Sequence, residues 1–98
     1  MLLAVDAGNT NITIGAFEEG LLIGRWRLRT VPGQTADEWG ILLRNLFSLA
    51  SLDLSTVHGI IISSVVPPLD SSLARMAEVY FHTQATFVTP ATDTGIKI

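Results

Sequence analysis

The chain contains 98 residues, of which 48% are hydrophobic and 15% are charged, with a formal net charge of −3 and no cysteine. This composition is typical of one globular domain and excludes a disordered chain, a disulfide framework and a metal site built on thiolates. The acidic balance argues against nucleic acid or an anionic membrane surface as the main partner.

The mean hydropathy of +0.44 is high for a domain of this size. Polar residues interrupt every apolar stretch before it reaches the roughly 18 residues that a membrane span requires. Residues 1–5 are followed at once by Asp6 and carry no basic region, so we do not expect a signal peptide. We expect a cytoplasmic protein with no membrane partner. Two explanations of its high hydropathy are open: the strands are buried on both faces, or a surface is covered by further chain.

Three strands are predicted at the start of the chain. Residues 2–5 form a short apolar run, and residues 12–17 alternate between apolar and other side chains, which is typical of a strand. Gly8-Asn9 and Glu19-Gly20 provide turns; Gly8 and Asn9 both tolerate positive φ, and we expect it at Gly8. Residues 21–29 complete the group as a third strand.

The third strand carries a stripe of arginines. Regular alternation places Leu22, Trp26 and Leu28 on one face and the arginines on the other. Such a stripe is compatible with nucleic-acid binding, but the acidic net charge favours a solvated sheet surface. The stripe consists of Arg25, Arg27 and Arg29.

A helix is predicted to begin at a capping box and to end near Ser51. Thr35 caps the first free amides, and Glu38 reaches back to the cap. Asp37 and Glu38 are also compatible with a pair of catalytic carboxylates, although capping accounts for Glu38. The apolar stripe of this helix is Trp39, Leu42, Leu43, Leu46, Phe47 and Ala50.

The rest of the chain predicts a strand, a second helix and a last strand. Residues 57–62 are rich in β-branched side chains and indicate a buried central strand. Pro67-Pro68 suits the first turn of a helix, and residues 85–88 form the last strand, which Pro90 ends. The order βββαβαβ predicts an α/β fold, in which a mixed sheet has helices packed on its faces. The apolar stripe of the second helix is Leu69, Leu73, Met76, Ala77, Tyr80 and Phe81.

The turn after the first strand, Asp6-Ala7-Gly8-Asn9-Thr10-Asn11, has the chemistry of a phosphate site. Backbone amides, small hydroxyls and a metal can together hold a triphosphate. Gly8 permits close approach of the backbone, and Asp6, at the carboxyl end of a buried strand, is placed to hold a hydrated Mg²⁺. An ordinary hairpin turn is the alternative. The chain contains neither a Gly-Lys-Ser/Thr phosphate loop nor a GxGxxG dinucleotide motif.

Three segments resemble the type III pantothenate kinase family, a branch of the actin-like kinases that has also been described as Bvg accessory factors. They are the turn that begins at Asp6, Thr35-Ala36-Asp37-Glu38-Trp39-Gly40, and Ile62-Ser63-Ser64-Val65-Val66-Pro67-Pro68-Leu69. Thr94-Gly95 resembles the segment that closes this region. The resemblance covers the whole chain, and its second and third segments are specific to the family.

The resemblance implies a ribonuclease H-like (actin-like) amino-terminal domain. It also implies ATP-dependent phosphorylation of pantothenate, the first step toward coenzyme A, in a homodimer. Mg²⁺, held by Asp6 through water, and a monovalent cation, K⁺ or NH₄⁺, would be required. The residues implied to hold the ATP phosphates are Asp6, Ala7, Gly8, Asn9, Thr10, Asn11, Ile12 and Thr13.

The resemblance also implies that the general base lies beyond Ile98. We therefore expect no catalytic residue in this chain, and we expect residues 1–98 to be the amino-terminal nucleotide-binding half of a protein whose second domain follows. Two alternatives remain open: another actin-like small-molecule kinase, and a non-catalytic regulatory module of the Bvg accessory factor type.

Four further residues have a functional and a structural interpretation. Ser63 and Ser64 follow a central strand where α/β proteins form ligand sites, so either a phosphate contact or a capped turn is compatible with the sequence. His58 is expected at a strand edge, and His82 near a helix carboxyl end. The two histidines lie far apart and have no cysteine companion, so a zinc site is not expected.

Overall fold

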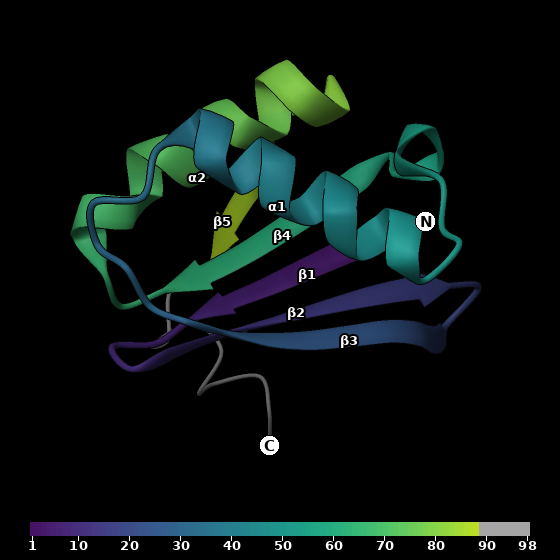
Figure 1. Ribbon diagram of the computed structural model, residues 1–98, viewed down its shortest axis with the longest axis horizontal. Coiled ribbons are helices and arrows are strands. Elements are labelled where there is room, and N and C mark those ends of the chain that lie inside the picture. The colour runs from purple at the N-terminus through teal and green to yellow at the C-terminus, as the bar shows by residue number, and fades with distance from the viewer. Residues whose placement is uncertain (89–98) are drawn as a thin grey trace.

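The computed structural model describes residues 1–88, which form a five-stranded mixed sheet with both helices on one face (Figure 1). The strand order is β3-β2-β1-β4-β5. β1 pairs with β2, and β2 with β3, in antiparallel fashion, whereas β4 is parallel to both β1 and β5. The predicted order of elements is confirmed; Pro90 and Thr94-Gly95 lie outside the described residues. The elements are β1 (Leu2–Ala7), β2 (Asn11–Glu18), β3 (Leu21–Arg29), α1 (Ala36–Leu49), the 3₁₀ turn η1 (Leu54–Thr56), β4 (Gly59–Ser64), α2 (Pro67–Phe81) and β5 (Thr86–Val88).

The two predicted hairpin turns differ in conformation. Glu19 and Gly20 have φ of 51° and 82°, the pattern of a tight hairpin turn. The prediction of positive φ at Gly8 is wrong, because neither Gly8 nor Asn9 lies in the left-handed region. The Gly8 amide instead donates to the Asn11 carbonyl at 2.9 Å. A Cβ at Gly8 would lie 3.1 Å from that oxygen, so close approach, not φ, favours glycine here.

A β-bulge in β3 overturns part of the predicted alternation. Ala16 pairs with Gly24 and Phe17 with Leu22, so Ile23 is an extra residue on the β3 side. The bulge turns Leu22 away from the helices, and it lines the opposite face together with Phe17. The prediction that Leu22 shares a face with Trp26 and Leu28 is therefore wrong, because the period of two is broken between them.

α1 begins as predicted and ends slightly earlier than predicted. The Thr35 hydroxyl accepts from the Glu38 amide and the Glu38 carboxylate accepts from the Thr35 amide, which completes the capping box. The helix ends at Leu49, and Ser51 then has φ of 59°. This left-handed residue lets the Leu52 amide reach back to the Phe47 carbonyl at 2.8 Å and so satisfies an end carbonyl.

β4 starts two residues later than predicted and runs two residues further. Leu54–Thr56 form a 3₁₀ turn whose last bond joins the Val57 amide to the Leu54 carbonyl, so Val57 is not in the strand. The strand then extends through both Ser63 and Ser64 at the carboxyl edge of the sheet.

The core lies between the sheet and the two helices. Trp26 of β3 stacks on Phe47 of α1 with ring centroids 5.6 Å apart. The Tyr80 hydroxyl donates to Asp37 at 2.6 Å and joins α2 to α1. A Cβ at Gly40 would lie 2.5 Å from the Tyr80 ring, so this glycine permits the helices to approach. Fully buried side chains of the core include Leu3, Ile12, Ile14, Trp39, Leu43, Ile60, Ile62, Leu69, Leu73 and Met76.

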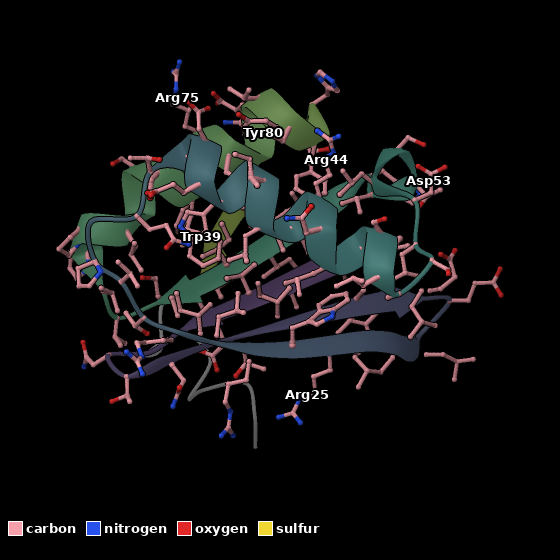
Figure 2. The ribbon with its side chains drawn as sticks, in the orientation of Figure 1. Arg25, Trp39, Arg44, Asp53, Arg75 and Tyr80 are labelled. Carbon is pink, nitrogen blue, oxygen red and sulfur yellow. The ribbon has the colours of Figure 1, made fainter. Side chains whose placement is uncertain are left out.

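The opposite face of the sheet carries no helix within residues 1–88, and Figure 2 shows Arg25 projecting from it, away from α1 and α2. Its apolar members include Leu2, Leu22 and Ile61, which are 38%, 51% and 38% exposed. We refer to it below as the open face. Neither helix of the described region is long and apolar enough to cross a membrane.

Candidate functional site

The turn between β1 and β2 lies at the carboxyl edge of the parallel strands, beside the turn that joins β4 to α2. Asp6, the penultimate residue of β1, is exposed and pairs with Thr13 of β2 on one side. On its other side it pairs with Ser63 of β4. This edge is where open α/β sheets form ligand sites, because loops diverge there and leave room for a ligand.

Four hydrogen bonds hold the backbone of the turn. The Gly8 amide closes the turn on Asn11 O, and the Val65 amide donates to Ala7 O at 3.0 Å. Thr30 makes two bonds: its hydroxyl donates to Gly8 O at 2.7 Å, and its amide donates to Thr10 O at 3.0 Å. The turn is therefore fixed from both neighbouring segments of the sheet before any ligand arrives.

The tip of the turn keeps polar groups for a ligand. Asn9 and Thr10 lie outside both strands and are exposed. Within residues 1–88, their amides donate to no backbone carbonyl. Free amides in a tight turn form a concave site for anions, since each N–H can donate to a phosphate oxygen without a charged side chain.

The predicted phosphate-site residues are brought together, but their side chains are not equally available. The side chains of Asp6, Asn9, Thr10 and Asn11 are exposed, and Thr13 is half-buried beside Asp6. The side chains of Ala7 and Ile12 are buried in the core, at 1% and 0% exposed, so only their backbones can face a ligand.

The donor set at Asp6 is compatible with a hydrated magnesium ion. Residues 1–88 contain no group of three His, Cys, Asp or Glu side chains close enough to hold a metal. A single carboxylate beside hydroxyls is a hard, oxygen-only set, and Mg²⁺ commonly keeps several waters and takes its other ligands from phosphate. The protein part of such a site is thus one carboxylate, as the sequence predicts for Asp6.

A depression of about 210 Å³ lies on the open face next to Asp6. It is smaller than the roughly 300–1,000 Å³ typical of a site that encloses a small molecule. This depression by itself therefore does not enclose a small molecule. Its lining is Ala4, Val5, Asp6, Thr13, Gly15, Phe17, Leu22 and Arg25.

The other candidates have structural partners. Glu38 is engaged in the capping box, and Asp37 accepts the Tyr80 hydroxyl on the helix side of the sheet. His58 lies 3.0 Å from the Met1 amine, at the opposite edge of the sheet from Asp6. His82 is the left-handed residue that caps α2. No acid–base pair is assembled among these residues.

The three arginines of β3 are exposed, as a solvated surface requires, and pair with Gly15, Thr13 and Asn11 of β2. They therefore form a row along β3 on the open face, with Arg29 nearest the β1–β2 turn and Arg25 furthest from it.

Two polar residues at the site were missed or left undecided by the sequence interpretation. Thr30 was assigned only to a loop, although counting the hairpin from the Glu19-Gly20 turn brings it near Thr10. The sequence does not distinguish Ser63 from Ser64, because the predicted strand ends at residue 62. The register of β4 against β1 shows that Ser63, and not Ser64, lies beside Asp6.

Comparison with known proteins shows the family of the chain and supports its fold. The model of the type III pantothenate kinase family matches residues 2–98. A type III pantothenate kinase from Solibacter usitatus is 70% identical over 98 residues, and one from Koribacter versatilis is 45% identical over 108 residues. The chain spans only 38% and 39% of the lengths of these two relatives.

Among solved structures, the ROK hexokinase from Thermus thermophilus superposes with a TM-score of 0.64 at 14% identity, over 90% of this chain and 34% of that one. At such low identity the likeness concerns the fold alone. The chain has the ribonuclease H-like fold of the actin-like kinases, as the resemblance implied.

Proposed function

Because the chain belongs to the type III pantothenate kinase family, we propose that it forms the phosphate-binding wall of an enzyme that phosphorylates pantothenate with ATP. The observation that supports this most directly is the β1–β2 turn, which is fixed by Thr30 and Val65 and keeps the Asn9 and Thr10 amides free. The product, 4'-phosphopantothenate, lies on the route to coenzyme A.

In this proposal the turn binds the ATP phosphates mainly through its backbone. Gly8 brings the chain close to the phosphates, and the Asn9 and Thr10 amides donate to their oxygens. The Asn11 side chain and the Thr13 hydroxyl extend the same row of donors along β2. Amides fixed before binding need no reorganisation during the reaction, which is the general basis of electrostatic stabilisation of a transferring phosphoryl group.

Asp6 would hold Mg²⁺ through water next to these phosphates. A bound Mg²⁺ supplies positive charge that offsets the charge developing on the phosphoryl oxygens. Asp6 would position it from a strand end whose backbone is paired with neighbours on both sides. K⁺ or NH₄⁺ would also be required, with ligands supplied by the rest of the protein.

No residue of the described region is assigned as the general base. The rest of the full-length protein would supply the base, the adenine-binding wall, the second domain and the homodimer contacts. The chain spans about 38% of the length of a relative that it matches. Residues 1–98 are then the amino-terminal domain of a two-domain kinase.

The decisive test is Asp6→Asn in the full-length protein. Asparagine keeps the shape of the side chain and loses its charge, so turnover should fall by roughly a hundredfold or more, with an increased requirement for Mg²⁺ and an unchanged unfolding midpoint. Glu78→Gln, which neutralises an exposed carboxylate near the far end of α2, is the matched control and should retain activity.

Substrate choice is tested in the same assay. Pantothenate-dependent formation of ADP supports the proposal, whereas turnover of a sugar in place of pantothenate would assign another actin-like kinase. Tight nucleotide binding by the full-length protein without turnover of any acceptor would favour a regulatory module. An Asp6→Asn protein with the activity and Mg²⁺ response of the wild type would remove Asp6 from the site.

A further inference from the structure

Four polar residues form a row across the open face at the level of Asp6. The strand register places Asp6 of β1 beside Thr13 of β2 and Ser63 of β4, and Thr13 in turn beside Arg27 of β3. Neighbouring strands lie about 4.7–4.9 Å apart, and residues opposite each other project to the same side of a sheet. Asp6 therefore has a hydroxyl-bearing neighbour on each flank.

The direction of this row follows from burial. Val5, Ile14 and Ile62, which adjoin Asp6, Thr13 and Ser63 along their strands, are 3%, 0% and 0% exposed under the helices. Side chains alternate along a strand, so the row faces away from the helices, on the open face. The half-buried Ser63 is thus aimed at the same space as the exposed Asp6 carboxylate.

The two adjacent serines have different surroundings. The Ser64 hydroxyl accepts from the Val66 amide at 3.0 Å and lies 3.4 Å from the Val66 carbonyl, so it belongs to the turn that starts α2. Ser64 pairs with Ala7, which is buried on the helix side. Among residues 1–88 the Ser63 hydroxyl has no hydrogen-bond partner, although the site beside it is polar.

We propose that Ser63 is a further ligand-positioning residue, whose hydroxyl bonds the hydrated magnesium–phosphate group that Asp6 and the β1–β2 turn hold. A hydroxyl can donate to a phosphate oxygen or accept from a metal-bound water, so Ser63 can bond either part of the magnesium–phosphate group. The binding surface then extends over three strands, with Asp6 at its centre. This inference rests on the proposed function and assigns to β4 a part in nucleotide binding.

The test uses the full-length protein and equilibrium binding of ADP with and without Mg²⁺, measured by calorimetry beside the ATP kinetics. Ser63→Ala should weaken Mg·ADP binding and raise the KM for ATP by roughly three- to tenfold, the usual effect of losing one hydrogen bond. Its unfolding midpoint should not change, because the hydroxyl makes no bond within the described region. A loss seen only with Mg²⁺ assigns the contact to a metal-bound water, and an equal loss without Mg²⁺ assigns it to a phosphate oxygen.

Two variants separate binding from structure. Ser63→Thr keeps a hydroxyl in a β-branched side chain suited to a strand and should restore Mg·ADP affinity. Ser64→Ala should instead lower the unfolding midpoint, because the Val66 amide loses its acceptor. Wild-type affinity in Ser63→Ala, or failure of Ser63→Thr to restore it, would overturn the inference while leaving the proposed function intact if Asp6→Asn is impaired. Wild-type behaviour of Asp6→Asn as well would overturn both.

Discussion

Thr30 stabilises the phosphate turn from outside the motif. Its hydroxyl and its amide bond the carbonyls of Gly8 and Thr10, on either side of the exposed Asn9. The two bonds occupy both carbonyls, which would otherwise repel an anion bound at the turn, as the proposed function requires. The motif from Asp6 to Asn11 thus depends on a residue at the end of another strand.

We predict that Thr30→Val in the full-length protein raises the KM for ATP by roughly three- to tenfold through loss of the Gly8 bond, with a smaller effect on the KM for pantothenate. Thr56→Val is the matched control, because it removes a similar hydroxyl–carbonyl bond, to Asp53 at 2.7 Å, on the opposite edge of the sheet. Steady-state kinetics with each substrate varied in turn provide the measurement. Equal changes in both KM values, or equal effects of the two variants, would contradict a specific role for Thr30.

The sequence alone predicts Asp6 and the turn as a candidate site, but it does not single out Thr30 or Ser63. The chemistry of the turn is local, since Asp, Gly, Asn and Thr follow one another within six positions. Thr30 and Ser63 acquire their roles only through register, which depends on the bulge at Ile23 and on where β4 begins. The alternation of apolar and polar residues predicts neither the bulge nor the start of β4.

At the scale of elements, the two helices are joined by one polar contact above an apolar interface. The Tyr80 hydroxyl donates a hydrogen bond to the Asp37 carboxylate, and this bond raises the pKa of the phenol above 10.0. Burial and the charge of Asp37 act in the same direction. A raised pKa in the folded state means that the folded protein holds the proton more tightly. The contact therefore stabilises α1 against α2 fully at pH values below about 10, and its contribution is lost as the pH rises through the folded-state pKa.

We predict that Tyr80→Phe lowers the urea midpoint at neutral pH and that the difference from wild type shrinks above about pH 10. Urea denaturation at a series of pH values gives the measurement. Asp37→Asn is the companion variant: it keeps an acceptor but removes the charge, so its alkaline loss of stability should begin at a lower pH than in the wild type. Parallel pH curves for the wild type and Tyr80→Phe would exclude the contact as the cause.

Element types were more predictable than element boundaries. The capping box at Thr35 and the prolines at the start of α2 are local signals, and the structure has both helices where these signals are. The end of α1 was missed by two residues, because Ser51 takes the left-handed conformation that usually marks a glycine. The 3₁₀ turn at Leu54–Thr56 is too short to show a periodic pattern of apolar residues, so the sequence does not predict it.

At the scale of the whole molecule, the open face is divided into two parts. Toward the amino end of β1 it is apolar and includes Leu2, Phe17 and Leu22, and toward the carboxyl end it carries Asp6 and the arginines. Apolar surface of this kind is normally covered in a stable protein, and the chain spans about 38% of the length of its relatives. Part of the high mean hydropathy thus lies on the open face, and its cover by further chain stays a prediction.

We predict that purified residues 1–98 show no pantothenate phosphorylation and do not saturate with ATP at millimolar concentration. One wall can hold phosphates but cannot bury adenine or exclude water. The same chain should self-associate through its open face, as measured by sedimentation at several concentrations. Adding the separately expressed remainder of the protein should reduce self-association and restore turnover. Robust turnover by residues 1–98 alone would show that the general base has been wrongly placed beyond them.

The mixed pairing of β1 also sets an order of events in folding. β1, β2 and β3 are joined by short turns, so their antiparallel ladder closes over a small separation along the chain. The pairing of β1 with β4 joins Leu2 to Gly59 and must wait for a much longer loop to close. We therefore expect the turn after Asp6 to take shape early, with Thr30 already beside it, and to gain its Val65 and Ser63 neighbours last. In a nascent chain, the surface that joins the turn to Ser63 would then be complete only once β4 has docked.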